Sequence, residues 1–428
     1  MNPKGYRFSE GMKICIDARI PTGQFGGVEH VILGLAGGYA SLELGDSEIT
    51  FLTSQEMAKQ LAPLVRDNPG LACKTTELQP TKTISELADR LLGQRFSERL
   101  KYLALAVLGN RIFRIPHQQD VVTEAFDLIH FPTQQAFWTQ APNIYHPHDL
   151  QHLHLPEYFN RFTFRSREYK YRAFCEQATT VAVTSTWIKN DLVSSYGLHP
   201  DKIAVIPLAP PNQHYVKPRE EELTRIRREL DLPDGFVFYP AQTWPHKNHL
   251  GLVRAAARIK RQHGRTVPLV FSGKVTEFRR QIQAEIDRLG LTESVHFLGF
   301  VTPKELQALY RLCTAVLIPS RYEAASFPLW EAYLAGAATA CAATTSLPQQ
   351  AQDASLIFDP ANVEEIAQAM LQLWQDESLR RNLVDRGRKR VSQFTWERTC
   401  SHFLALYRRL INCSEEGDSD ILNGEPML

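Results

Sequence analysis

Short apolar runs, rich in β-branched residues, alternate along the whole chain with segments of helical periodicity. Twelve of these runs have the length of a strand and lie at 13–18, 48–54, 128–132, 143–148, 179–185, 202–209, 236–241, 268–273, 295–300, 315–320, 338–344 and 355–360. The runs of the second half are nearly continuous in apolar residues, as expected of parallel strands covered by helices on both faces. We therefore expect an α/β protein with two doubly wound, Rossmann-like domains.

A domain boundary is expected between the two sets of strands. The segment LAPPNQHYVKPREEE at 208–222 combines three prolines with a charged run and interrupts the pattern. We assign residues 1–210 to the first domain and 211–393 to the second. Ligands of such sheets bind beyond the carboxyl ends of the strands, so we expect a cleft where the two domains face each other.

Two segments depart from this rhythm. Residues 84–115 read as amphipathic helices with arginine and lysine beside the apolar run YLALAVL. We expect a helical insertion packed on its own domain, and a peripheral contact with a membrane interface stays open as the alternative. Residues 413–428 are acidic and without periodicity, and we expect them to be disordered.

Composition narrows the range of partners. The 48 basic and 47 acidic side chains leave a formal charge of +1, which argues against a general nucleic-acid binder. The seven cysteines are scattered, as is usual in a reducing cytosol. The N-terminus has no apolar core of a secretory signal, and no stretch reaches the length of a membrane span. We expect a cytoplasmic protein, with a peripheral position at the inner face of the cell membrane as a further possibility.

The stretch RYEAASFPLWEAYLAGAATA, 321–340, carries the clearest chemistry. It follows a strand-like run and holds Glu323 and Glu331. Pro328 suits a helix start and Gly336 a helix end. Glu323 is then expected in the loop and Glu331 in the first turns of the helix. The backbone N–H groups of residues 326–330 are expected to point outward as an anion site.

This stretch resembles the E-x7-E signature of the family 4 glycosyltransferases, which are retaining enzymes of the two-domain GT-B fold. The matching residues are Pro319, Ser320, Glu323, Phe327, Pro328, Leu329, Glu331, Ala332 and Gly336. The resemblance extends to the glycine-rich GQFGGVEHV at 23–31, to Lys247 in WPHKNH, and to residues 394–412. The last segment resembles the family's closing helix, which crosses back to the N-terminal domain.

The resemblance implies a role for each matching residue. Glu323 would accept hydrogen bonds from the donor sugar and Glu331 from the nucleotide ribose. Lys247 would face the diphosphate leaving group, and Gly26 and Gly27 would let the backbone approach a phosphate or acceptor. The other donor-binding positions implied are Gln242, Ser326, Phe327, Pro328 and Leu329. Neither a metal nor a cofactor is implied.

Three positions depart from the family pattern. Ala324 and Ser326 stand where the family usually has glycines. Gln242 stands where an arginine often precedes the lysine. The loss of that arginine removes a bidentate phosphate clamp, so diphosphate binding would depend more on Lys247 and on helix dipoles.

Four histidines lie within HPHDLQHLHLPEYF, 146–159. The pattern HDLQH is close to the HExxH of zinc peptidases, but Asp149 is shorter than the required glutamate and a strand-like run precedes it. The resemblance instead places His148 at the family's active-site histidine, near the anomeric carbon. Asp149 would orient His148 or meet the acceptor hydroxyl.

The function that we predict is a retaining, metal-independent hexosyltransferase. It would move a hexose from a nucleotide sugar to a hydroxyl of a glycan or glycolipid acceptor, as in bacterial polysaccharide synthesis. GDP-mannose is favoured over a UDP-sugar, because WPHKNH and HDLQH resemble mannosyltransferase-like members. A GT-B phosphorylase or epimerase is the alternative, and a zinc hydrolase using His148 and His152 is the alternative from another class.

Overall fold

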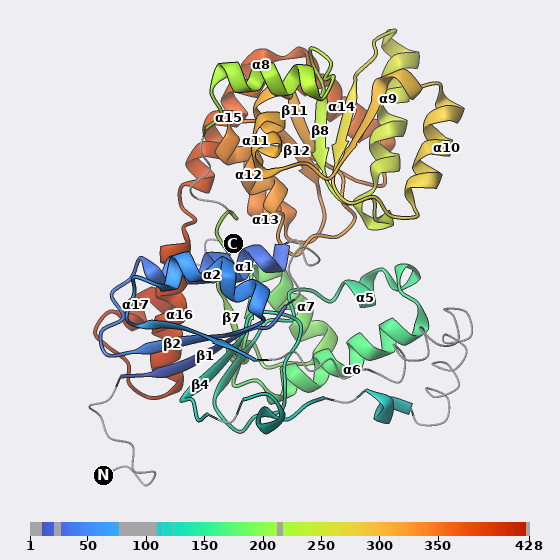
Figure 1. The fold of residues 1–428 in the computed structure, drawn as a ribbon. Coiled ribbons are helices and arrows are strands. Elements are labelled where there is room, and N and C mark those ends of the chain that lie inside the picture. The colour runs from blue at the N-terminus through green and yellow to red at the C-terminus, as the bar shows by residue number, and fades with distance from the viewer. Residues whose placement is uncertain are drawn as a thin grey trace, which may run out of the picture. The chain divides into compact units, whose positions relative to one another are not determined.

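The computed structural model describes residues 11–20, 27–76, 109–113, 115–122, 124–211 and 217–424. The chain forms two compact units (Figure 1). Unit 1 runs to Pro207 and resumes at Trp396, and unit 2 spans Leu208–Thr395. The passage between Pro207 and Leu208 lies at the start of the proline-rich segment 208–222.

Unit 1 is built on a parallel sheet of seven strands in the order β3-β2-β1-β4-β5-β6-β7. The strands are β1 Lys13–Ala18, β2 Glu48–Thr53, β3 Leu71–Thr75, β4 Leu128–Phe131, β5 Asn143–Tyr145, β6 Thr180–Val183 and β7 Ile203–Val205. The α-helices of unit 1 are α1 Gly27–Ala40, α2 Gln55–Val65, α5 Gln151–His154, α6 Arg161–Gln177, α7 Thr186–Tyr196, α16 Trp396–Leu410 and α17 Asp418–Asn423. Its short 3-10 helices are η1 Gly109–Ile112, η2 Gln118–Asp120, η3 Pro156–Tyr158 and η4 Pro200–Lys202.

Unit 2 has a parallel sheet of six strands in the order β10-β9-β8-β11-β12-β13. The strands are β8 Val237–Pro240, β9 Leu269–Ser272, β10 Val295–Gly299, β11 Ala315–Ile318, β12 Thr339–Ala342 and β13 Leu356–Phe358. The α-helices are α8 Glu220–Glu229, α9 His249–His263, α10 Arg279–Leu289, α11 Pro303–Leu312, α12 Phe327–Ala335, α13 Leu347–Ala351, α14 Val363–Gln375 and α15 Glu377–Val391. The 3-10 helices are η5 Pro245–Lys247 and η6 Thr292–Ser294.

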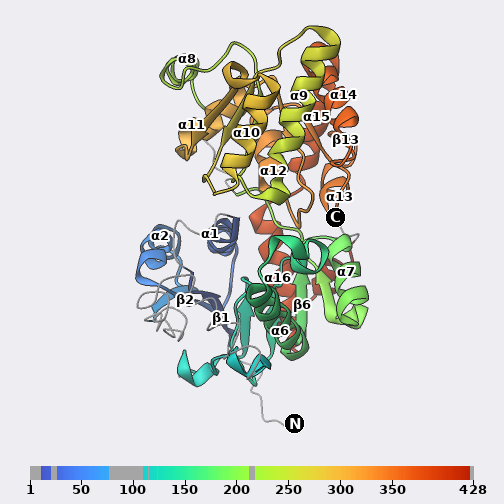
Figure 2. The ribbon, with the colours of Figure 1, turned by 90° about the vertical axis from the view of Figure 1, so that its right-hand side faces the viewer.

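Helices cover both faces of each sheet (Figures 1 and 2), so the predicted α/β fold with two doubly wound sheets is confirmed. Each of the twelve predicted runs contains one strand. Strand β3 was not predicted, because its sequence LACKT has only a weak apolar pattern and the strand pairs with β2 alone at the edge of the sheet. In unit 2 the strand order reverses between β8 and β11, and ligands of open α/β sheets bind beside such a point.

Helix α16 belongs to unit 1, although the chain reaches it only after completing unit 2. Gly34 and Gly38 of α1 allow this helix to pack closely: an added Cβ at Gly34 would lie 2.0 Å from the ring of Trp396. The hydroxyl groups of Tyr39 and Tyr407 share a buried hydrogen bond of 2.7 Å. The sheet of unit 1 therefore depends on residues from both ends of the chain.

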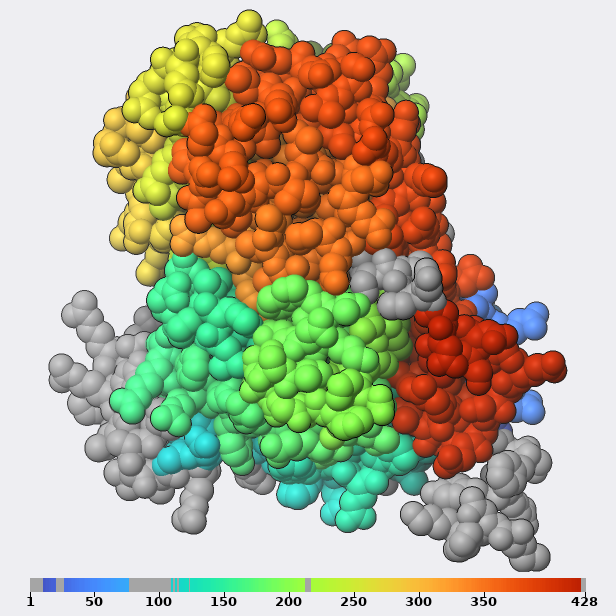
Figure 3. All heavy atoms as spheres, turned by 180° about the vertical axis from the view of Figure 1, so that it is seen from behind, coloured from blue at the N-terminus to red at the C-terminus, as the bar shows by residue number. Residues whose placement is uncertain are grey.

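The prediction of disorder over 413–428 is wrong for part of that segment. Residues 418–423 form α17, which packs on α16. Buried Asp418 accepts a hydrogen bond from Arg408 at 3.1 Å. The prediction failed because the periodicity of a sequence does not reveal such an ion pair. In Figure 3, the red residues of α16 and α17 form part of the surface of unit 1.

Most of the predicted helical insertion at 84–115 lies outside the described residues, which resume at Gly109. Across the described ranges, none of the helices combines the length and the apolar character needed to cross a bilayer.

We predict that Gly34→Ala destabilises unit 1 by about 1–3 kcal/mol, because the new methyl group overlaps Trp396. The matched control is Gly37→Ala in the same helix, where no atom of the described ranges lies within 4 Å of an added Cβ. This control is expected to gain about 0.5–1 kcal/mol from its higher helix propensity. Urea unfolding of both variants measures the difference, and equal effects would contradict close packing of α1 on α16.

Candidate functional site

The loops that follow β8 and β11 meet at the carboxyl edge of the sheet in unit 2. Lys247 ends η5 after β8, and Glu323 lies in the loop between β11 and α12. Because β8 and β11 are neighbouring parallel strands, their carboxyl ends lie together. The sheet order thereby brings together two residues that are 76 positions apart in sequence.

Lys247 and Glu323 form an ion pair with 2.6 Å between Nζ and Oε1. The Ser320 hydroxyl donates to the same carboxylate oxygen at 2.7 Å, and the Tyr239 hydroxyl lies 2.8 Å from Ser320 Oγ. Because Ser320 has only one hydroxyl proton and gives it to Glu323, Tyr239 must donate to Ser320. Glu323 is only 8% exposed, so these donors and the ammonium group compensate a buried charge.

Asn248 holds the Lys247 loop in place. Its backbone has a φ of 57°, in the left-handed region that asparagine tolerates better than most residues. Its amide nitrogen donates to the carbonyl groups of Pro319 and Pro360, each at 3.0 Å. A further bond runs from the N–H of Arg321 to the carbonyl of His246. These contacts fix the ends of β8 and β11 to each other.

Helix α12 begins after Ser326, with Pro328 in its first turn and Gly336 at its end, as predicted. Fewer backbone N–H groups are available to an anion at this helix start than we expected over 326–330. The Ser326 N–H donates to Gln350 Oε1 at 2.8 Å, the Trp330 N–H lies 3.4 Å from the Ser326 carbonyl, and proline has no N–H. The Ser326 hydroxyl is buried and has no hydrogen-bond partner among the residues that the structure describes.

Glu331 lies in the middle of α12, where it accepts a 2.7 Å hydrogen bond from the Tyr310 hydroxyl of α11. It lines a pocket of about 260 Å³ beside basic side chains. The pocket residues are Lys217, Pro218, Gln307, Tyr310, Arg311, Glu331, Leu334, Ala335 and Arg388. Glu331 and Glu323 therefore accept hydrogen bonds from different side chains.

The remaining predicted donor residues differ in how accessible they are. Leu329 has no exposed surface, so its side chain belongs to the core. Gln242 Oε1 accepts a hydrogen bond from the indole N–H of Trp244 at 2.8 Å. Phe327 and Pro328 are part-buried. In unit 1, Gly27 is the exposed first residue of α1, and Gly26 lies outside the described residues.

His148 follows β5 in unit 1, with a φ of 61° that is uncommon for a residue other than glycine. Its Nε2 lies 2.9 Å from the carbonyl oxygen of Pro132. A carbonyl only accepts, so Nε2 carries the proton and Nδ1 is the acceptor of the neutral ring. Burial lowers the pKa of His148, so the ring is neutral at physiological pH.

Behind His148 lies a buried chain of hydrogen bonds from β5 to α16. His146 Nε2 lies 2.7 Å from His130 Nε2, and His130 Nδ1 lies 2.6 Å from the Tyr407 hydroxyl. Burial lowers the pKa of His130 to about 3 and that of His146 well below its ordinary value. His146 is therefore a hydrogen-bonded core histidine.

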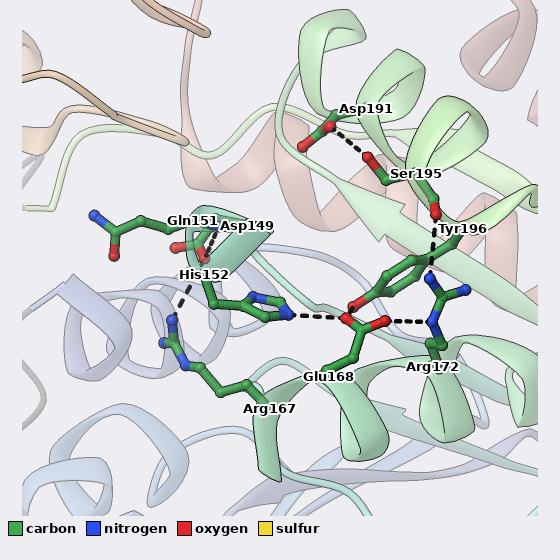
Figure 4. A network of polar contacts seen from close by, with 9 residues as sticks. All are labelled: Asp149, Gln151, His152, Arg167, Glu168, Arg172, Asp191, Ser195 and Tyr196. Atoms are coloured by element: carbon green, nitrogen blue, oxygen red, sulfur yellow. Dashed lines mark hydrogen bonds and ion pairs between the residues drawn. The ribbon is translucent and has the colours of Figure 1, made fainter. Parts of the chain in front are cut away.

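Asp149 makes no hydrogen bond to His148. Its Oδ1 accepts the N–H of Gln151 at 3.1 Å, and Arg167 Nη1 lies 4.0 Å from the same oxygen (Figure 4). His152 faces Glu168 at 3.1 Å, and Glu168 also accepts bonds from Arg172 and Tyr196 (Figure 4). Asp149 and His152 thus take part in a network between α5, α6 and α7.

The same geometry opposes the zinc-peptidase reading. That motif needs both histidines on one helical turn, but α5 begins at Gln151, after the left-handed His148. The last histidine of the segment, His154, is engaged elsewhere, because its Nε2 lies 2.8 Å from Asp191 Oδ1. Within the ranges that the structure describes, no group of three His, Cys, Asp or Glu residues is arranged to hold a metal ion.

Sequence reasoning missed Tyr239, Thr345 and Gln350. Tyr239 reaches Glu323 through Ser320, and Thr345 and Gln350 bind the backbone of the Glu323 loop. Neither Thr345 nor Gln350 lies in a recognisable motif. The strand-end position of Tyr239 was the one signal that the sequence offered.

Comparison with known proteins identifies the fold and then the family. HepE of Anabaena, in its complex with UDP-glucose, superposes with a TM-score of 0.66 at 18% identity over 93% of this chain and all of that chain. The fold is therefore GT-B. Residues 221–390 match the family model for glycosyl transferases group 1, and residues 77–209 match that for glycosyltransferase family 4. Together the two matches cover more than two thirds of the chain, which belongs to the family 4 glycosyltransferases.

Two similar relatives are mannosyltransferases of Escherichia coli. O-antigen chain mannosyltransferase B is 26% identical over 319 residues, which are 70% of this chain and 83% of that protein. Serotype-specific mannosyltransferase WbdA is 30% identical over 201 residues. That match covers 46% of this chain but only 25% of WbdA.

We predict that Lys247→Met and Glu323→Gln are strongly non-additive in stability. Removing the lysine alone leaves a buried carboxylate without its cation, whereas the double variant leaves no charge to compensate. The double-mutant cycle, measured by urea unfolding, should give a coupling of about 0.5–3 kcal/mol. The control cycle uses Arg381→Met and Glu377→Gln, an exposed pair at 3.5 Å, and is expected to be near zero. Additive effects at Lys247 and Glu323 would contradict the pairing.

We predict that His249→Leu makes unit 2 less sensitive to acid. Burial lowers the pKa of His249 to about 3, whereas unfolding restores an ordinary value of about 6.5. The stability from the neutral ring is therefore complete above about pH 6.5 and is lost as the pH falls toward 3. The variant should remove up to about 1.4 kcal/mol per pH unit of this loss.

Urea unfolding between pH 7.5 and 5 measures that slope. The control is His263→Leu at the exposed end of α9, which should leave the slope unchanged. An identical slope for His249→Leu and the unmodified protein would contradict the assignment.

Proposed function

We propose that this chain is a retaining hexosyltransferase that moves mannose from GDP-mannose to a hydroxyl of a glycan or glycolipid acceptor. The proposal includes activity without a divalent metal. The observation that carries it is the Lys247–Glu323 pair, a cation and a carboxylate at the point where the strand order of unit 2 reverses. Family membership and the mannosyltransferase relatives support a sugar donor at this position.

Lys247 and Glu323 have complementary tasks in this reaction. The donor diphosphate competes with Glu323 for the Lys247 ammonium group, and the freed carboxylate oxygen accepts hydrogen bonds from sugar hydroxyls. The bond between the anomeric carbon and the diphosphate oxygen breaks as the acceptor oxygen bonds to the same face of that carbon. The diphosphate gains negative charge at this step, and a fixed ammonium group stabilises it. The acceptor proton passes to the departing diphosphate, so no enzyme nucleophile is needed.

The proposal also gives a role to other residues of each unit. Glu331 binds the ribose, and Ser326 meets the diphosphate at the start of α12. The buried Ser326 hydroxyl has no partner within the described part of the chain. His148 offers Nδ1 as an acceptor to the donor sugar, and Asp149 meets the acceptor. Gly26 and Gly27 allow the loop after β1 to approach a phosphate or acceptor.

GDP-mannose is preferred because both compared relatives bear the name of mannosyltransferases. A UDP-sugar is the rival donor, since HepE of Anabaena was solved with UDP-glucose. The acceptor is proposed as a polysaccharide or its lipid-linked precursor, and the insertion at 84–115 as a peripheral contact with the inner face of the cell membrane. Flotation with anionic vesicles, with and without residues 84–108, tests that last point.

We predict that GDP-mannose and GDP raise the thermal stability of the protein more than UDP-glucose and UDP do. A ligand held at 100 times its Kd stabilises the folded state by about 2.7 kcal/mol, which thermal unfolding detects. Lys247→Met should lose most of this effect, and the exposed Lys389→Met should keep it. The proposal fails if no nucleotide or nucleotide sugar stabilises the unmodified protein.

Product analysis distinguishes the reaction types. A transferase releases GDP only when an acceptor sugar is present, and the new bond has the anomeric configuration of the donor. A phosphorylase would need inorganic phosphate, and an epimerase would act without any acceptor. Addition of EDTA tests the metal-independent step and is expected to leave the rate unchanged.

A further inference from the structure

The loop that carries Glu323 is held by two side chains from one short segment. This segment, which we call the clamp, comprises residues 343–351 and runs from the end of β12 through α13. The Thr345 hydroxyl accepts the Glu323 N–H at 3.0 Å and donates to the Glu323 carbonyl at 2.6 Å. One hydroxyl therefore binds both backbone polar groups of the residue expected to recognise the sugar.

Gln350 does the same for Ser326, three residues further along. Its Oε1 accepts the Ser326 N–H at 2.8 Å, and its Nε2 donates to the Ser326 carbonyl at 2.7 Å. The side chain is 1% exposed, so both bonds form away from water. Arg390 of α15 holds the clamp in place, because its guanidinium group donates hydrogen bonds to the carbonyl groups of Gln350 and Gln349.

Thr345 adopts a backbone conformation that opposes its own residue type. Its φ is 49°, in the left-handed region, where a β-branched side chain is a true outlier. Strain of this kind persists only where the surrounding structure imposes it, and it gathers at functional sites. Glycine would adopt this conformation without strain but has no hydroxyl to bind Glu323.

We propose that Thr345 and Gln350 are positioning residues. They fix the backbone of Glu323 and Ser326 before the donor binds. This inference rests on the proposed function, because it assumes that Glu323 recognises the sugar and that the start of α12 meets the diphosphate. A loop fixed in advance loses less conformational freedom when a ligand binds, and small displacements of recognition groups are costly. The clamp fixes the loop through hydrogen bonds to its backbone. It forms no ion pair with Lys247 or Glu323, because residues 343–351 carry no charged side chain.

The two residues act on different parts of the donor. Thr345 holds Glu323, so its loss should weaken binding of the nucleotide sugar much more than binding of the nucleoside diphosphate alone. Gln350 holds Ser326 at the start of α12, so its loss should weaken both ligands. This contrast is one that a merely structural role does not produce.

The first experiment measures GDP and GDP-mannose binding by calorimetry on the full chain with Thr345→Ser, Thr345→Val and Thr345→Gly. Thr345→Ser keeps the hydroxyl and should bind like the unmodified protein. Thr345→Val and Thr345→Gly should lose about tenfold in affinity for GDP-mannose and less than about threefold for GDP. Thr345→Gly also relieves the backbone strain, so its thermal midpoint should not fall while its sugar binding does.

The second experiment uses Gln350→Leu, which removes both bonds to Ser326 and should weaken GDP and GDP-mannose by similar factors of about ten. The control for it is Gln368→Leu on an exposed face of α14, and that for Thr345→Val is the exposed Thr266→Val. Both controls should bind like the unmodified protein. If Gln350→Leu fails to fold, Thr345→Gly and Thr345→Ser still decide the inference.

The outcomes separate this inference from the proposed function. If the unmodified protein binds neither GDP-mannose nor a UDP-sugar, the proposed function fails, and the inference fails with it. If the unmodified protein binds a UDP-sugar instead, the same variants are measured with that donor and its diphosphate. If the unmodified protein binds its donor and Thr345→Gly binds it equally well, or loses sugar and diphosphate affinity in parallel, only the inference is overturned.

Discussion

The contact between Lys247 and Glu323 is the interaction on which the site of unit 2 depends. It exists because β8 and β11 are neighbours in the sheet and both end at the same edge. A carboxylate that is 8% exposed needs compensation, and here a cation, the Ser320 hydroxyl and, behind it, the Tyr239 hydroxyl provide it. In the proposed function, the donor diphosphate would take the place of Glu323 beside Lys247, and sugar hydroxyls would take the place of Lys247 beside Glu323.

Unit 1 uses a different electrostatic solution. His130 of β4 and His146 after β5 are neutral, because burial lowers the pKa of each, and they share a short hydrogen bond. His130 also shares a short hydrogen bond with the Tyr407 hydroxyl. This arrangement leaves no buried charge, and it joins the strand that leads to His148 with α16. Helix α16 is therefore part of the support of the histidine region.

The loop of Glu323 shows how departures from a family pattern can be compensated. Glycine is usual at two positions of this loop, which here hold Ala324 and Ser326. The conformational freedom that those glycines would offer is absent, and the clamp at 343–351 determines the backbone by direct hydrogen bonds. Shape at this loop therefore comes from neighbouring side chains and from the strained Thr345, more than from glycine.

The sequence by itself determined the two parallel sheets and the start and end of α12, because these depend on local periodicity and on proline and glycine. The sequence did not determine β3, because the apolar pattern of this strand is weak and its pairing with β2 stabilises it. Nor did it determine α17, which depends on the contact between Arg408 and Asp418. The roles of Tyr239, Thr345 and Gln350 were decided only by tertiary structure, because each acts through a partner far along the chain. The tertiary structure also decided that Asp149 lies toward Arg167 and that amide groups at the start of α12 are already used.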